Sequence, residues 1–223
     1  MRYHLPANHA PHKRFSRCTA IPAKRQRVSR DPFETLLAEA RACRACAGLL
    51  PHGPRPVVQV SPAARVLIIG QAPGSKVHAS GVPWDDDSGD RLREWTGLSR
   101  EAFYDAVQVA LVPMGLCYPG KATGGDLPPR KECAPLWHAR LIAGMPDLRL
   151  TLLVGQYAQK AYLPRELRGS LTEAVRRHAE APPGVIPLPH PAWRSRLWMQ
   201  RHPWFEADVL PMLRRRIAEA LRG

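Results

Sequence analysis

Short apolar runs alternate with amphipathic segments along most of the chain. The runs cover residues 65–70, 107–112, 150–155 and 185–188. A short continuous apolar run, closed by glycine or another turn residue, is typical of a strand buried in a parallel sheet. The pattern therefore predicts four buried strands.

Apolar residues at helical spacing lie between these runs. The first helix is expected to begin at Asp31, with Asp31 as N-cap and Pro32 in the first helical position, and to extend to about residue 46. The other expected helices cover residues 89–95, 134–142, 156–162, 171–178 and 203–221. Alternating strands and helices predict an α/β fold, a three-layer α/β/α sandwich with a central, mostly parallel four-stranded sheet. Residues 31–223 form one expected domain, and the turn-rich residues 118–129 are expected to be an exposed loop.

The charge distribution adds a partner class to this picture. The formal net charge is +14, and residues 1–30 contribute eight Lys or Arg and no acid. This balance favours a polyanion such as nucleic acid or an anionic membrane as partner. Residues 1–30 show no hydrophobic period, so we expect a disordered basic tail, either a solvated segment or an arm that tethers DNA. A start codon placed too early or an organellar transit peptide would also account for such a tail.

Membrane insertion and secretion are not expected. No apolar run approaches the roughly 20 residues needed to cross a bilayer, and the N-terminal residues lack the apolar stretch of a signal peptide. We therefore expect a cytoplasmic monomer without a membrane partner.

Five cysteines point to a metal rather than to disulfides. An odd number in a chain with no secretory signal argues against a disulfide framework. Cys43 and Cys46 form a Cys-x2-Cys pair, Cys117 and Cys133 follow later, and Cys18 lies in the basic tail. Clustered thiolates bind metal, although buried free cysteines would also account for the pattern.

The carboxyl ends of parallel strands are where ligands bind in such a fold. Gly70, Gln71, Ala72, Pro73 and Gly74 follow the first run, and their glycines permit close approach of the backbone to a ligand. Further along are Trp84 and four nearby acids, Asp85, Asp86, Asp87 and Asp90. A purely structural role would place Trp84 in the core and Asp87 or Ser88 at a helix N-cap, but capping accounts for only one or two of these groups.

A second polar loop follows the last run. His190 lies between two prolines, which hold it in a rigid extended segment. Trp193, Arg194 and Arg196 come next and supply an aromatic wedge and phosphate ligands, as a nucleic-acid-binding loop needs. A lone histidine is usually structural, but its place at a strand end favours contact with a substrate.

These loops resemble the motifs of the uracil-DNA glycosylase superfamily. Residues 70–74 look like its first motif, and residues 190–192 look like its His-Pro-Ser turn. Residues 81–84 resemble the Gly-x-Pro-Phe segment of the iron–sulfur branch, whose Phe stacks on the base. The cysteine arrangement is similar to the cluster ligands of that branch. The resemblance implies a [4Fe–4S] cluster on Cys43, Cys46, Cys117 and Cys133, while zinc suits four cysteines equally well on chemistry alone.

The resemblance implies excision of uracil or a related deaminated base from DNA by hydrolysis of the N-glycosidic bond. The base would be flipped out of the duplex and stacked on Trp84. His190 would donate a hydrogen bond to the departing base oxygen, helped by the backbone amides of Gln71 and Ala72. We expect Gly70, Pro73, Gly74 and His78 to line the substrate site.

Three departures from the family pattern affect this expectation. Gln71 and Ala72 stand where related proteins keep a carboxylate, Val77 and His78 replace an acidic pair, and Pro113 replaces the Asn that binds the uracil edge. Asp85 and Asp86 become the best candidates for the catalytic acid, with Asp85 slightly favoured and His78 third. Two alternatives remain: a non-catalytic binder of damaged DNA, and a nucleotide hydrolase that uses the same crevice.

Overall fold

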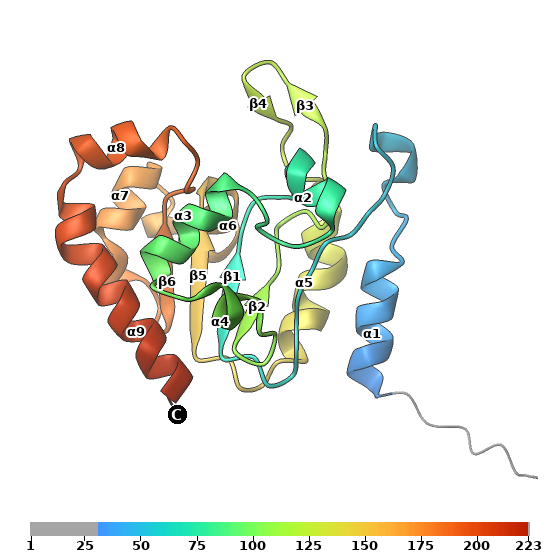
Figure 1. Cartoon of the computed structure of the whole chain (residues 1–223), viewed down its shortest axis with the longest axis horizontal. Coiled ribbons are helices and arrows are strands. Elements are labelled where there is room, and N and C mark those ends of the chain that lie inside the picture. The colour runs from blue at the N-terminus through green and yellow to red at the C-terminus, as the bar shows by residue number, and fades with distance from the viewer. Residues whose placement is uncertain (1–30, 223) are drawn as a thin grey trace, which may run out of the picture. The chain divides into compact units, whose positions relative to one another are not determined.

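A computed structural model describes residues 31–222, so the expected basic tail at residues 1–30 and Cys18 lie outside the described residues. The central sheet has the strand order β2-β1-β5-β6 and every pairing in it is parallel (Figure 1). Its strands are β1 (Val66–Ile69), β2 (Val109–Leu111), β5 (Leu150–Val154) and β6 (Val185–Leu188). The four predicted strands and their parallel arrangement are confirmed.

Helices cover both faces of this sheet, as a three-layer sandwich requires. The α-helices are α1 (Pro32–Arg41), α2 (Ser75–Ser80), α3 (Asp87–Thr96), α4 (Arg100–Tyr104), α5 (Cys133–Ala143), α6 (Gln156–Tyr162), α7 (Leu171–Arg176), α8 (Ser195–Arg201) and α9 (Leu210–Arg222). Single turns of 3-10 helix cover Ala47–Leu49, Arg165–Leu167 and His178–Glu180, and a π-helical turn at Phe205–Val209 precedes α9.

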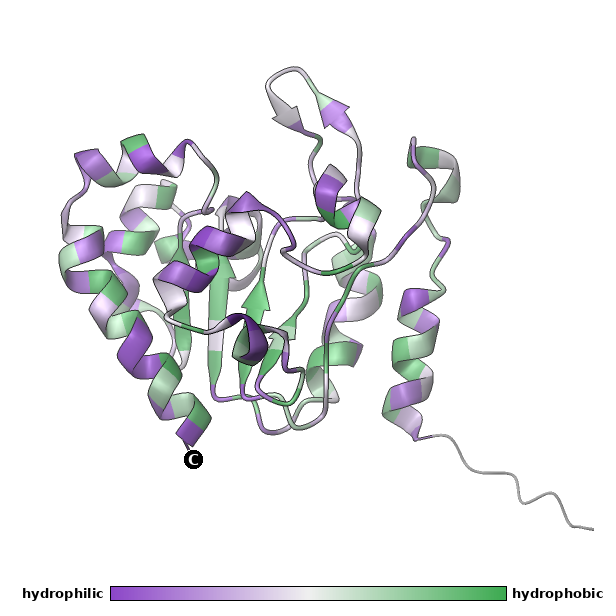
Figure 2. Cartoon of the chain, viewed as in Figure 1, coloured by the Kyte–Doolittle hydropathy of each residue, from purple (hydrophilic) through white to green (hydrophobic). Residues whose placement is uncertain are grey.

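Alternate residues of each strand enter two separate cores. Leu67 and Ile69 of β1 pack in one core, which includes side chains of α1, α5 and α6. Val66 and Ile68 pack in the other core, against α3, α4 and α9. Every residue of β1 is buried, which is why the strand is apolar throughout rather than alternating. Figure 2 shows the strands of the central sheet mostly in green, between helices that carry both colours.

The predicted helix boundaries are correct at some ends and wrong at others. Asp31 caps α1 as expected, with its Oδ1 accepting from the Phe33 N–H at 2.8 Å. The expectation that this helix reaches residue 46 is wrong: it ends at Arg41, because the chain tightens into turns in which Cys43 N–H donates to the Ala40 carbonyl. Helices α2, α4 and α8, of five to seven residues, were not predicted.

Residues 121–128 of the predicted exposed loop are exposed, whereas residues 118–120 are buried against the domain, and the loop also contains a hairpin. Strands β3 (Lys121–Ala122) and β4 (Gly125–Asp126) pair antiparallel and turn at Gly124, whose φ of 87° suits glycine. The hairpin stands out from the domain near α2 (Figure 1). Within residues 31–222, no helix is long and apolar enough to span a bilayer.

Candidate functional site

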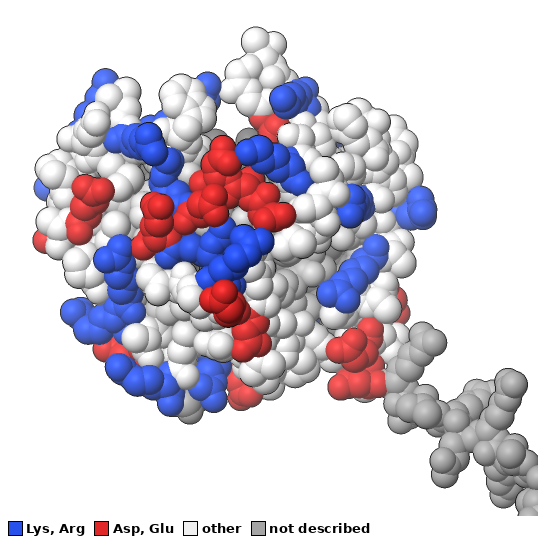
Figure 3. Space-filling model, in the orientation of Figure 1, with Lys and Arg blue, Asp and Glu red and all other residues white. Residues whose placement is uncertain are grey.

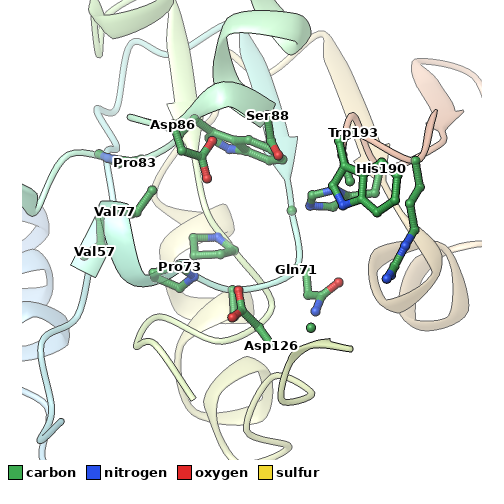
Figure 4. Close-up of a pocket in the computed structure, with 18 of the residues that line it drawn as sticks. Val57, Gln71, Pro73, Val77, Pro83, Asp86, Ser88, Asp126, His190 and Trp193 are labelled. Atoms are coloured by element: carbon green, nitrogen blue, oxygen red, sulfur yellow. The ribbon is translucent and has the colours of Figure 1, made fainter. Parts of the chain in front are cut away.

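The largest concentration of predicted site residues lies around one cavity of about 440 Å³ at the carboxyl ends of the strands. Its walls come from the loops after β1, β2 and β6, from the segment before α3, and from the β3–β4 hairpin (Figure 4). The main cavity is lined by Val57, Gly70, Gln71, Ala72, Pro73, Gly74, Val77, Pro83, Trp84, Asp86, Ser88, Pro113, Gly124, Gly125, Asp126, His190, Ala192, Trp193 and Arg194. The structure thus brings together loops that are more than 100 residues apart in sequence.

The loop after β1 is fixed to the loop after β2 by main-chain hydrogen bonds. The carbonyl groups of Gly70 and Gln71 accept from the N–H groups of Met114 and Gly115, at 2.9 and 3.0 Å. All five residues of the Gly70–Gly74 segment line the main cavity, as predicted for a substrate site.

Trp84 forms a wall of the cavity and is held in a strained backbone conformation. Its φ is 57°, which is uncommon for a residue other than glycine and costs about 1 kcal/mol or more. Tyr104 Oη donates to its carbonyl oxygen at 3.2 Å, and a side chain at Gly89 would collide with that oxygen. The indole ring passes so close to Gly70 that a Cβ there would lie 2.6 Å from Trp84 Cζ2. Strain of this kind is retained where the surroundings fix the residue, and it is common at functional sites.

His190 lies beside Trp84, with 5.7 Å between the ring centroids. The rigid loop after β6 carries it, and it lies beside Gly155, where a Cβ would be in ordinary contact with His190 Cβ at 3.4 Å. Burial lowers the pKa of His190, and the negative charge of Asp86 partly opposes this change. The imidazole is therefore neutral at neutral pH and keeps one N–H to donate.

The acidic segment before α3 sends its carboxylates in three directions. Asp86 lines the main cavity, and its Oδ1 also accepts from the Gly89 N–H at 2.9 Å, so Asp86 is the N-cap of α3. Asp85 instead pairs with Arg100 at 3.2 Å and is not among the residues that line the cavity. Asp87 pairs with Lys76 at 2.8 Å. The expected cap at Asp87 or Ser88 is wrong by one or two residues, and the cavity faces Asp86 rather than Asp85.

His78, the third candidate for a catalytic group, lies outside the cavity lining. Its ring contacts those of His52 and Tyr118, with centroids 5.9 and 5.8 Å away. Burial lowers the pKa of His78, and the charges of Arg55 and His52 lower it further. The helical turn of α2 directs Val77 into the cavity and His78 away from it.

The loop after His190 presents the residues predicted to contact DNA. Trp193 is 73% exposed, and the Arg194 guanidinium lies over its ring at 5.0 Å. Arg196 borders a second cavity together with Asp87, Arg91 and Trp193. Figure 3 shows Lys and Arg on both sides of a group of acidic side chains on this face.

Arg91 holds this loop in place and was not predicted from the sequence. Its Nη1 donates to the Ala192 carbonyl at 2.7 Å and to Ser195 Oγ at 3.3 Å. On a helix, an arginine of this kind looks like any solvated basic residue, so no sequence signal distinguishes it. Asp126 in the β3–β4 hairpin was missed for a similar reason, because its segment has no periodic pattern.

The four cysteines of the domain are close to one another and are not disulfide-bonded. Cys46, Cys117 and Cys133 are buried, and Cys46 packs with Cys117 and Leu50. Burial raises the pKa of Cys117 to about 11, and the neighbouring thiols of Cys133, Cys43 and Cys46 contribute to the rise. Within residues 31–222, no three His, Cys, Asp or Glu side chains are already placed around a single metal position. The donor set suits a group with four thiolate ligands, but the thiols would have to converge to bind it.

Comparison with protein families agrees with this geometry. The model of one family, described as the Uracil DNA glycosylase superfamily, matches residues 57–214. The match spans every residue that lines the main cavity, together with Cys117 and Cys133, but it begins after Cys43 and Cys46. It therefore identifies the superfamily without distinguishing among its branches.

Proposed function

Because this chain belongs to the uracil-DNA glycosylase superfamily, we propose that it removes uracil or a related deaminated base from DNA by hydrolysing the N-glycosidic bond. Superfamily membership supports a function of the uracil-DNA glycosylase type, with DNA as partner. The more specific proposal rests on one observation: Trp84, His190 and Asp86 all line the main cavity. A cavity of about 440 Å³ is within the usual range for a small-molecule site.

Trp84 and His190 provide the groups that would hold the base as it leaves. Stacking on an aromatic ring contributes about 1–3 kcal/mol per base, and any base has a face that can stack. As the C1′–N bond breaks, its electron pair moves onto the base. The neutral His190 N–H donates a hydrogen bond to the base oxygen on which that charge develops, and a preorganised donor of this kind is worth about 3 kcal/mol.

Asp86 is the carboxylate best placed to act on the sugar. Positive charge develops on C1′ as the base departs, and a nearby carboxylate offsets it. The same carboxylate orients a water molecule, whose hydroxyl bonds to C1′ while its proton passes to Asp86. The position of Asp86 supports this assignment, because Asp86 and His190 line the same cavity. The departing base anion then takes a proton from solvent.

Trp193, Arg194 and Arg196 would bind the DNA around the extruded nucleotide. An exposed tryptophan can enter the space that the flipped base leaves, while the two arginines bind flanking phosphates. The hydrogen bonds of Arg91 support this role, because they hold the loop without occupying its exposed side chains.

The four clustered cysteines are proposed to hold a [4Fe–4S] cluster, with zinc as the alternative. Four reduced thiols close to one another are what such a group needs. When bound, the group would tie α1 and the loop after β2 to the sheet. The steps above use only protein side chains and water.

A non-catalytic binder of damaged DNA is the second candidate. It is favoured by a specific observation: Ala72, where related proteins carry an acid, lines the cavity with a methyl group. The discriminating experiment is to incubate the protein with single-stranded and duplex DNA that contains uracil, hypoxanthine or xanthine. Formation of abasic sites on any of them supports the glycosylase, whereas selective binding without base release supports the binder.

A further inference from the structure

The β3–β4 hairpin forms one wall of the main cavity although it lies outside the central sheet. Gly124, Gly125 and Asp126 line the cavity, and Arg194 donates to the Gly124 carbonyl from both Nη atoms at 3.3 Å. The hairpin is thereby joined to the loop that follows His190. A base in the cavity would lie between these two segments.

Asp126 presents its carboxyl group to the interior of this cavity. Oδ1 lies 3.5 Å from Tyr118 Oη, and Oδ2 is 3.5 Å from the position of a Cβ at Gly74. An Oδ2 atom of Asp86 lies 3.8 Å from that same position, so the two carboxyl groups face each other across Gly74. Figure 4 shows Asp126 below the cavity, Asp86 and Ser88 above it, and His190 to the right. Among residues 31–222, Asp126 has no cation within ion-pair distance.

The cavity has few other groups that could bind the edge of a base. Pro113 lines it without an N–H, and its carbonyl already accepts from His138 Nε2 at 3.0 Å. Asp86 caps α3, and His190 is assigned to the oxygen next to the glycosidic bond. The other polar side chains in the lining are Gln71, Ser88, Asp126 and Arg194. Arg194 is already bound to the hairpin tip, and Ser88 lies in the first turn of α3, which leaves Gln71 and Asp126 for the edge of the base. Of these two, Asp126 is the side chain on the hairpin wall, across the cavity from Asp86 (Figure 4).

We propose that Asp126 binds the outer edge of the extruded base as a carboxylic acid, its O–H donating to the base carbonyl and its C=O accepting from the adjacent ring N–H. This inference rests on the proposed function. Uracil, hypoxanthine and xanthine all present an edge with one carbonyl and one N–H side by side. A protonated carboxyl group matches that edge as an amide does, whereas an ionised one would repel the base carbonyl.

The surroundings of Asp126 favour this protonation state once a base is bound. Burial raises the pKa of Asp126, and the charge of Asp86 raises it further. Lys121 and the Tyr118 hydroxyl act in the opposite direction, and the Arg194 guanidinium is engaged with the hairpin carbonyl. The side chain is exposed while the cavity is open. A stacked base would cover it and remove water, which disfavours the charged form more strongly.

The test compares Asp126→Asn and Asp126→Ala with wild type and with Asp147→Asn. Asp147 is an exposed carboxylate in the turn before β5, at the opposite end of the strands. Single-turnover base release is measured from about pH 5 to about pH 9 on the base that wild type removes best. Binding is measured in parallel on DNA that carries 2′-fluoro-deoxyuridine, whose fluorine blocks hydrolysis by destabilising the sugar cation.

The amide variant distinguishes an acid from a carboxylate. Asp126→Asn should stay within about threefold of wild type at low pH and exceed it at high pH, because an amide keeps its donor and does not ionise. Asp126→Ala should lose about 10- to 100-fold in rate and in analogue binding at low pH, since base groups are left unpaired. Asp147→Asn should follow wild type throughout.

Two results would overturn the proposal. If Asp126→Asn were as impaired as Asp126→Ala at every pH, the carboxylate itself would be required. If Asp126→Ala matched wild type in rate and in binding, Asp126 would not contact the base. Failure of the proposed function gives a different result, since wild type would then release no base from any substrate, and the analogue binding would still decide the role of Asp126.

Discussion

The close approach of Trp84 to Gly70 allows a direct test of the stacking wall. In Gly70→Ala, the new methyl carbon would lie 2.6 Å from Cζ2 and 3.3 Å from Cε2 and Cη2 of the indole. Carbon atoms in contact are normally about 3.5–4.0 Å apart, so the ring must withdraw by roughly 1 Å. The φ of Gly70 is not in the left-handed region, so the added methyl group acts on the ring and not on the backbone.

Two costs follow from this displacement. Overpacking should lower the free energy of unfolding by about 1–3 kcal/mol. If Trp84 is the stacking surface, loss of the stack should also weaken binding of an extruded base by about 1–3 kcal/mol. That corresponds to roughly 5- to 150-fold in affinity, at about 1.4 kcal/mol for each factor of ten.

The assay is the affinity for 2′-fluoro-deoxyuridine DNA divided by the affinity for undamaged DNA of the same sequence. Gly169→Ala is the matched control, because a Cβ at Gly169 meets only Glu173, at 3.9 Å. The double variant Gly70→Ala/Trp84→Phe should recover part of the ratio, since a phenyl ring leaves space for the methyl group. A folded Gly70→Ala protein with an unchanged ratio would refute Trp84 as the stacking surface.

Four further predictions follow from the site. Asp86→Asn should cut the rate of single-turnover excision by about 10²-fold or more, although the amide can still cap α3. Asp85→Asn should keep the wild-type rate. The reverse result would return the catalytic role to Asp85. Arg194→Ala should make the plot of log affinity against log salt concentration less steep by roughly one unit, and an unchanged slope would contradict its role as a phosphate ligand. Deletion of residues 1–30 should weaken non-specific DNA binding but leave base excision intact. Loss of excision in the deletion variant would contradict the role assigned to these residues. Burial lowers the pKa of His138 and His190 below their usual 6.5, so the unfolded chain takes up protons first as the pH falls. The free energy of unfolding should therefore fall as the pH drops below about 6.5, by up to about 1.4 kcal/mol per pH unit for each histidine. Urea denaturation midpoints that do not change between neutral and acidic pH would contradict this prediction. Anaerobically purified protein should contain iron and sulfide and absorb broadly near about 400 nm. Cys117→Ala should lose the iron, the sulfide and the absorption. Protein that contains no iron, or contains zinc instead, would refute the cluster.

The apolar pattern was enough to predict the sheet and the position of the main cavity. Four runs of buried residues, each followed by a turn, can form parallel strands only with helices on both faces, and ligands then bind at the carboxyl ends. The segment at residues 70–74 and His190 were found in this way, because each directly follows a strand. Helix α1 was located from Asp31 and Pro32, since capping depends on neighbouring residues alone.

Tertiary contacts decided which of the candidate side chains enter the main cavity. Asp85 and Asp86 are adjacent and chemically identical, and they differ in orientation because Arg100 of α4 pairs with Asp85, while Asp86 caps α3 through the nearby Gly89 N–H. The sequence also made His78 the third candidate, but the helical turn of α2 directs it toward His52 and Tyr118. Asp126 reaches the cavity only because the hairpin folds back over Gly74. Local sequence determines which side chains are available near a strand end, whereas the packing of remote loops determines which of them enter the cavity, because that choice depends on partners far away in the chain.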